Sequence, residues 1–176
     1  MTENGYRCLL ESGWFGKIII LVFFNINLLK NMKKKITVAV SGYFNPLHVG
    51  HLEMIEKAKK LGDRLVVIVN NDYQVKLKGS VPFLNQTDRI KIVSALKWVD
   101  KVFLSIDRDS SVCKSLAKIK PDIFAQGGDR SRGNIPSSET TVCRKLNIKR
   151  IDGLGKKIRS SSTLIAEAAK KKSVKK

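Results

Sequence analysis

Residues 36–51, ITVAVSGYFNPLHVGH, decide the fold. The first five are apolar or β-branched without a break, which is typical of a strand buried on both faces of a parallel sheet. A glycine, an asparagine and a proline then mark a turn. Apolar residues at helical spacing follow in residues 48–61, and Gly62 stands just past them. This stretch therefore predicts a strand, a loop and an amphipathic helix in direct succession.

The same alternation continues along the rest of the chain. Four more apolar strands are predicted, at residues 65–69, 102–104, 123–125 and 148–151. Helices are predicted after Asn85, which can cap one, and at residues 111–118, 139–146 and 162–171. Successive βαβ units with right-handed crossovers form a parallel sheet covered on both faces. We therefore predict an α/β fold, a Rossmann-like three-layer sandwich with a parallel sheet of about five strands, with ligands at the carboxyl ends of the strands.

The 176 residues are enough for one domain with a sizeable core. We expect an extension at 1–31 that the working protein can dispense with, a domain at 32–168 and a basic tail at 169–176. The apolar run 18–29 is shorter than the roughly 20 residues of a membrane-spanning helix. Membrane contact through this run is an alternative that we do not favour, beside a docked extra strand or helix.

The chain carries 34 positive and 15 negative residues, a net charge of +19. Such a charge suits nucleic acid, an anionic membrane surface or a polyphosphate substrate. Only 7% of the residues are aromatic, and no pattern interleaves them with basic residues, which argues against nucleic acid as the partner. Three widely spaced cysteines indicate neither a disulfide framework nor a metal knuckle, so we predict a cytoplasmic protein.

His48 and His51 are the two histidines of the chain, and they begin the first predicted helix. Free backbone amides and the helix dipole favour an anion at that end, and Gly50 keeps the backbone open to a ligand. Two imidazoles add donors that can follow charge developing on phosphate oxygens. No third ligand lies nearby in sequence, so we predict no metal site there.

FNPLHVGH in this setting resembles the HxGH signature of the cytidylyltransferase-like nucleotidyltransferases. The segments LEMIEKAKKLGDRLVVIVNND, NQTDR, KPDIFAQGGD and SSST resemble further blocks of the glycerol-phosphate cytidylyltransferase and ADP-heptose synthase branch. The resemblance implies transfer of a nucleoside monophosphate, with CMP favoured, from an NTP to a small phosphorylated alcohol or sugar. In this reaction the acceptor phosphate attacks the α-phosphorus in line with the pyrophosphate that leaves, and Mg²⁺ is carried by the triphosphate. Relatives often form homodimers.

Asn45 departs from that branch, which commonly has aspartate there. Asparagine at this place resembles the nicotinate and nicotinamide mononucleotide adenylyltransferases. An adenylyltransferase using ATP is therefore the alternative, with heptose phosphate, FMN or nicotinate mononucleotide as the type of acceptor. A second alternative is a non-catalytic RNA-binding or regulatory protein on the same fold.

The resemblance also implies roles for individual residues, each with a plainer alternative. Arg89 would act on the acceptor phosphate or pair on the helix surface with Asp88. The two loop lysines, 76 and 78, would touch phosphates or be solvated, and the aromatic rings at 43 and 44 would line the nucleotide or pack. Residues 128 and 129 would bind the nucleotide or form a plain turn. The serines at 160–162 would bind it or serve as a simple helix cap. The implied catalytic residues are His48, His51, Lys78 and Arg89. The implied nucleotide-binding residues are Tyr43, Phe44, Asn45, His48, Gly50, His51, Gly128, Asp129, Ser160, Ser161 and Ser162, and Lys76 and Arg89 would hold the acceptor phosphate.

Overall fold

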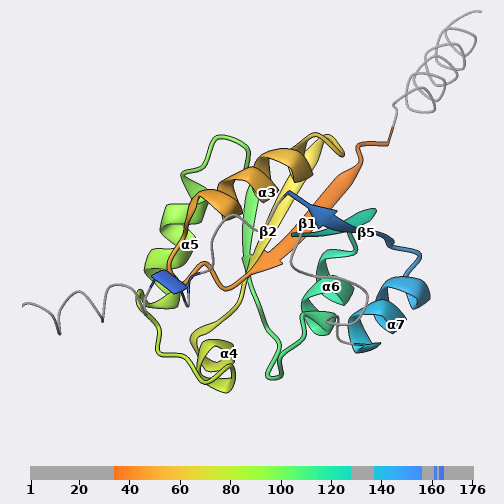
Figure 1. Cartoon of the computed structure of the whole chain (residues 1–176). Coiled ribbons are helices and arrows are strands. Elements are labelled where there is room, and N and C mark those ends of the chain that lie inside the picture. The colour runs from red at the N-terminus through yellow and green to blue at the C-terminus, as the bar shows by residue number, and fades with distance from the viewer. Residues whose placement is uncertain (1–33, 128–136, 156–160, 162, 165–176) are drawn as a thin grey trace, which may run out of the picture. The chain divides into compact units, whose positions relative to one another are not determined.

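Figure 1 shows a computed structural model, which describes residues 34–127, 137–155, 161, 163 and 164. These residues lie almost wholly within the compact unit Lys35–Lys176. The predicted extension and the basic tail lie outside them, as do most of the last predicted helix and Gly128, Asp129, Ser160 and Ser162. None of the described helices is long and apolar enough to cross a membrane.

The described residues contain one sheet of five parallel strands, as the sequence predicts. The strands are β1 (Thr37–Gly42), β2 (Arg64–Val69), β3 (Lys101–Leu104), β4 (Ile123–Gly127) and β5 (Lys149–Leu154). Their order across the sheet is β3-β2-β1-β4-β5, and each neighbouring pair is parallel. The Rossmann-like α/β prediction is therefore confirmed.

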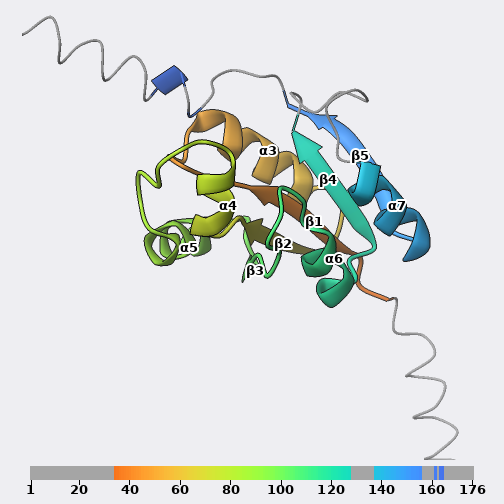
Figure 2. The same cartoon turned by 90° about the horizontal axis from the view of Figure 1, so that it is seen from below.

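Helices cover both faces of the sheet, because successive residues of each strand point to opposite sides. Val38 and Val40 of β1 belong to the core beneath α3 (Val49–Lys59) and α5 (Gln86–Ser94). Ala39, between them, belongs to a second core with α6 (Cys113–Ile119) and α7 (Ser137–Lys145). Figures 1 and 2 show these two helical layers. The predicted three-layer sandwich is confirmed.

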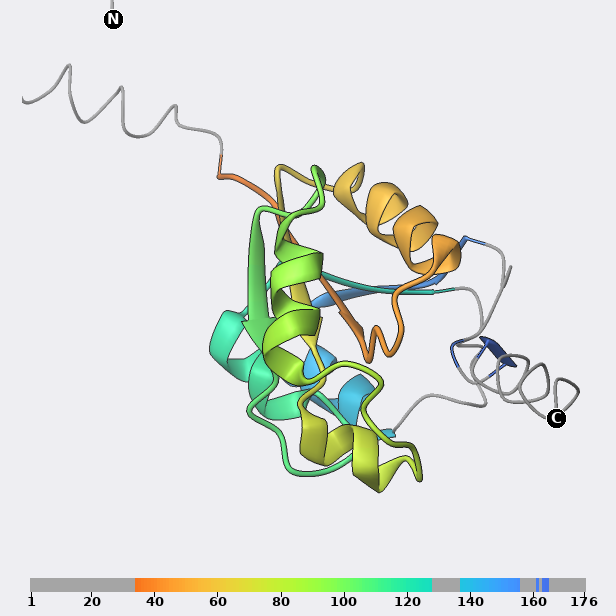
Figure 3. The ribbon, with the colours of Figure 1, turned by 90° about the vertical axis from the view of Figure 1, so that its left-hand side faces the viewer.

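The structure adds a short helix, α4 (Asp72–Leu77), that the sequence did not predict. Its cap is Asn71, whose side-chain oxygen accepts a hydrogen bond from the backbone N–H of Gln74 at 2.9 Å. The Asn71 amide also donates to the carbonyls of Ser105 and Asp107, both at 2.9 Å. These bonds tie α4 to the segment after β3, beyond the carboxyl ends of the strands (Figure 3).

Candidate active site

The order of strands reverses on either side of β1, and ligands of such sheets bind at this point. The ring of Phe44, just after β1, is 1% exposed and lies so close to Gly42 that an added Cβ there would be 2.8 Å from it. The ring edge also contacts the ring of His51, with centroids 4.9 Å apart. The Phe44 ring thus packs beneath the site, and a contact of this residue with the nucleotide stays a prediction.

The two histidine rings are stacked, with centroids 3.8 Å apart and planes at 19°. His48 precedes the first turn of α3 in an extended conformation, and His51 is the third helical residue, with Gly50 just before it. The backbone N–H of His48 donates to Nδ1 of His51 at 3.3 Å. Because Nδ1 accepts this bond, the proton of the neutral His51 ring is on Nε2.

Burial, together with the neighbouring charges of His48 and Lys78, lowers the pKa of His51 to about 3. His51 is therefore neutral at ordinary pH. Its Nε2–H is a fixed hydrogen-bond donor at the N-terminal end of a helix, where the free amides also attract anions. Such a donor suits a phosphate oxygen and needs no protonation to act.

Asn45 joins two loops of the site. Its side chain is 4% exposed, its amide donates to the carbonyl of Val81 at 3.0 Å, and its oxygen accepts from the backbone N–H of Phe83 at 2.5 Å. The loop between α4 and α5 is thereby fixed against the loop between β1 and α3. The amide both donates and accepts here, which the carboxylate of an ionised aspartate could not do.

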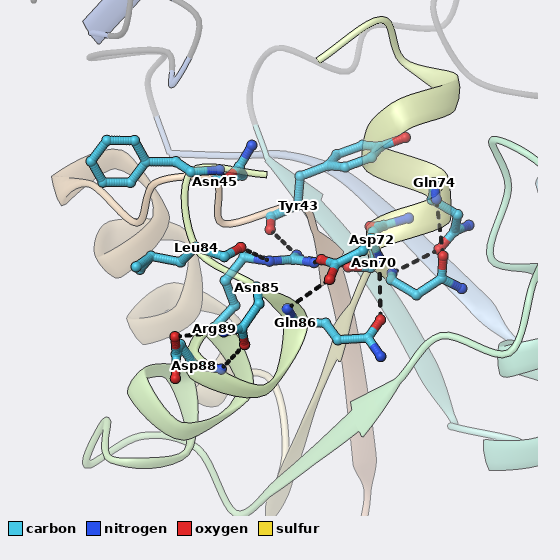
Figure 4. Close-up of polar contacts among 12 residues, drawn as sticks. Tyr43, Asn45, Asn70, Asp72, Gln74, Leu84, Asn85, Gln86, Asp88 and Arg89 are labelled. Carbon is cyan, nitrogen blue, oxygen red and sulfur yellow. Dashed lines mark hydrogen bonds and ion pairs between the residues drawn. The ribbon is translucent and has the colours of Figure 1, made fainter. Parts of the chain in front are cut away.

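Arg89 lies at the centre of the same region (Figure 4) and is 1% exposed. Its guanidinium donates to the carbonyls of Tyr43 at 2.6 Å, Asn70 at 2.7 Å and Leu84 at 3.2 Å. It also forms a 2.7 Å ion pair with Asp72. The plainer alternative for Arg89 is wrong, because the side chain is buried rather than on the helix surface and pairs with Asp72 rather than Asp88. Its contact with an acceptor phosphate stays a prediction.

Asp72 is a residue that the sequence reasoning missed. One carboxylate oxygen binds Arg89, and the other accepts from the backbone N–H of Gln86, the first residue of α5, at 3.1 Å. In return the Gln86 side chain accepts from the N–H of Asp72 at 3.1 Å. The acidic residue at the end of the VIVNND segment was the available signal, but its partners are 14 and 17 residues away.

Two predicted lysines and one predicted serine also lie within the described part of the chain. Lys78 follows α4 directly, and its Nζ lies 4.7 Å from the centre of the Tyr43 ring, beside the histidine pair. Lys76 is exposed and belongs to helix α4 rather than to a loop. The hydroxyl of Ser161 donates to the carbonyl of Pro46 at 2.9 Å, across 115 residues of sequence. The structure therefore brings Ser161 to the loop that leads to the histidines.

Within the described residues, no group of three His, Cys, Asp or Glu side chains lies together in a way that could hold a metal ion. The protein side chains seen here thus form no resident metal site.

The model of the cytidylyltransferase-like family matches residues 39–168. FAD synthase of Thermoplasma volcanium is 32% identical over 131 residues, which are 73% of this chain and 91% of that protein. FAD synthase of Archaeoglobus profundus is 41% identical over 114 residues, 65% of this chain and 72% of that protein. The crystal structure of a lipopolysaccharide core biosynthesis protein from Thermoplasma volcanium is also similar. It has a TM-score of 0.60 and 30% identity, and the match covers 70% of this chain and 99% of that one.

The fold, the stacked histidines and these matches define the class of protein: the chain is a nucleotidyltransferase. It belongs to the cytidylyltransferase-like family. The resemblance seen in the sequence is thereby confirmed.

Proposed function

We propose that the chain is an adenylyltransferase that joins AMP from ATP to FMN and releases pyrophosphate. The observation that carries this proposal is the 32% identity to an FAD synthase over 91% of that protein's length. FAD consists of FMN and AMP linked through their phosphates, so a nucleotidyltransferase makes it by adenylyl transfer. The proposal adopts the alternative from the sequence and sets it above CMP transfer.

In the proposed reaction, an oxygen of the FMN phosphate attacks the α-phosphorus of ATP. A new phosphoanhydride bond forms, the bond between the α-phosphorus and the bridging oxygen breaks, and pyrophosphate carries that oxygen away. The protein has to position both phosphates in line and stabilise the charge on them. Mg²⁺ would accompany the triphosphate and neutralise part of its charge.

The described residues supply donors for these tasks. Nε2–H of His51 offers a neutral donor at the start of α3, with the stacked His48 ring beside it. Lys78 adds a positive charge next to the pair, as its effect on the pKa of His51 indicates. Ser161, held at the carbonyl of Pro46, places its hydroxyl at the same loop. In the proposal these groups hold the triphosphate, while Arg89 and Asp72 keep the surrounding loops in place.

The test measures pyrophosphate release by the full chain with Mg²⁺, pairing ATP or CTP with FMN, glycerol phosphate, heptose phosphate or nicotinate mononucleotide. We expect release with ATP and FMN and formation of FAD. His48→Ala and His51→Ala should each lower kcat by about 100- to 1,000-fold, the usual cost of one transition-state donor. Ile92→Ala, which truncates an exposed side chain of α5, is the matched control and should keep full activity.

Thermal unfolding of each variant shows that lost activity is not lost fold. Turnover with CTP and glycerol phosphate, but not with ATP and FMN, would overturn the proposal and restore the first expectation. Near wild-type kcat in both histidine variants would overturn the assigned site. The homodimer stays a prediction, and so does the expectation that nucleic acid is not a partner.

A further inference from the structure

Exposed apolar side chains gather on α4 and on the loop that follows it. Four of the large exposed hydrophobic residues in the described part of the chain fall within eleven positions: Tyr73, Leu77, Val81 and Phe83. Val81 is 80% exposed and Phe83 is 66% exposed, the largest fractions among them. A single exposed apolar residue is ordinary, but two on one loop beside a site indicate something that covers them.

This loop is held in place although its side chains face solvent. Asn45 binds the carbonyl of Val81 and the N–H of Phe83. Before them, the N–H of Gly79 donates to the carbonyl of Lys76 at 2.9 Å, and the N–H of Ser80 donates to that of Val75 at 3.2 Å. The two apolar side chains are therefore presented on a fixed backbone.

The loop also adjoins the histidine pair. Asn45, its anchor, lies three residues before His48 in the chain. The Nζ of Lys78, at the beginning of the loop, lies over the ring of Tyr43, and its positive charge helps to lower the pKa of His51. Phosphate-binding groups and exposed apolar groups are thus carried by one short segment.

We propose that Val81 and Phe83 form the contact surface for the flat aromatic ring system of the acceptor, the isoalloxazine of FMN. This inference rests on the proposed function. An acceptor whose phosphate reaches the histidine pair must place the rest of its body beside the site, and FMN has a large planar ring system there. The Tyr43 ring has Lys78 over it, so Phe83 is the more exposed ring of the two.

Phe83 and Val81 are in this view specificity-determining residues. A contact between two aromatic rings contributes about 0.5–1.5 kcal/mol beyond the contribution of the area that it buries. Removing the Phe83 ring should therefore lower the affinity for the acceptor measurably. Alanine at either position keeps the backbone N–H and carbonyl that Asn45 binds. The substitutions therefore remove the apolar surface and leave the loop anchored.

The experiment compares wild type, Phe83→Ala, the double variant Val81→Ala/Phe83→Ala, and the control Ile92→Ala. We expect the KM for FMN to rise roughly 5- to 10-fold in Phe83→Ala and more in the double variant. The KM for ATP should stay within about twofold, because neither substitution removes a group that the proposal places on the triphosphate. Fluorescence anisotropy of FMN with a non-hydrolysable ATP analogue should show the same loss of affinity without turnover.

An unchanged KM for FMN in the double variant, with wild type producing FAD, would overturn this inference and leave the proposed function standing. Equal rises in the KM for FMN and for ATP would overturn it as well, because they indicate a general disturbance of the site. A change from dimer to monomer with unchanged FMN affinity would assign the surface to a second copy of the chain. Wild type that shows no FMN-dependent release of pyrophosphate from ATP would overturn both proposals.

Discussion

Replacing Asn45 by aspartate tests how the two loops of the site are joined. The variant keeps the oxygen that accepts from the N–H of Phe83, but it places a second oxygen opposite the carbonyl of Val81, 3.0 Å away. The hydrogen bond is lost, and a carboxylate that is nearly buried faces another acceptor. Val81 itself is well exposed, so its carbonyl can regain water, and we expect a loss of about 1–3 kcal/mol in the free energy of unfolding at pH 7.5.

The pH dependence of this loss is the sharper part of the prediction. Burial and the facing carbonyl raise the pKa of the introduced carboxyl above its unfolded value. The penalty is then full above the raised pKa and fades as the pH falls through it, because a protonated carboxyl can donate to Val81. Asn45→Ala is the matched control, since its deficit relative to wild type should not depend on pH.

Urea unfolding at pH 7.5 and pH 5 measures all three proteins. A domain of ordinary stability, about 5–15 kcal/mol, leaves room to measure a loss of this size. The reasoning is refuted if Asn45→Asp is as stable as wild type at pH 7.5. It is also refuted if its deficit is larger at pH 5 than at pH 7.5.

Three further predictions follow from particular contacts. The neutral His51, with its pKa of about 3, must gain a proton on unfolding below pH 6.5, so wild type should lose about 2 kcal/mol relative to His51→Gln between pH 7 and pH 5 in urea unfolding; equal slopes would contradict this. Gly62→Ala should destabilise by about 1–3 kcal/mol, because the new Cβ would be 2.8 Å from the carbonyl oxygen of Ile36; thermal unfolding equal to wild type would disprove it. Burial raises the pKa of Cys143 to about 11, so iodoacetamide should label it in the native protein far more slowly than Cys113, as mass spectrometry would show; equal rates would refute the buried position.

The sheet and its main helices were predictable because their signals are local. The buried parts of β1, β2 and β4 begin with unbroken apolar runs, and α5 begins where Asn85 accepts a hydrogen bond from the N–H of Asp88 at 2.9 Å. Helix α4 was missed because it has six residues, too few to show an apolar period. The sequence signal for α4 is the asparagine at position 71. An asparagine is equally typical of a turn until its hydrogen-bond partner is known.

The candidate site was only partly predictable for a related reason. The histidine pair is visible in sequence because its members are three residues apart. The partners of Arg89 are 46, 19 and 17 residues distant, at Tyr43, Asn70 and Asp72, so sequence spacing could not show that the arginine joins three loops. Ser161 reaches Pro46 across 115 residues, and the motif resemblance implied only that both segments lie at the nucleotide.

The contact between Gly42 and Phe44 constrains how this chain can diverge. Any side chain at position 42 would collide with the ring at position 44, so a larger residue at the first requires a smaller one at the second. A smaller residue at 44 would in turn withdraw the ring that supports His51. Among relatives, and in variant libraries selected for activity, changes at position 42 should therefore occur together with changes at position 44. Single changes at position 42 should be depleted by the selection.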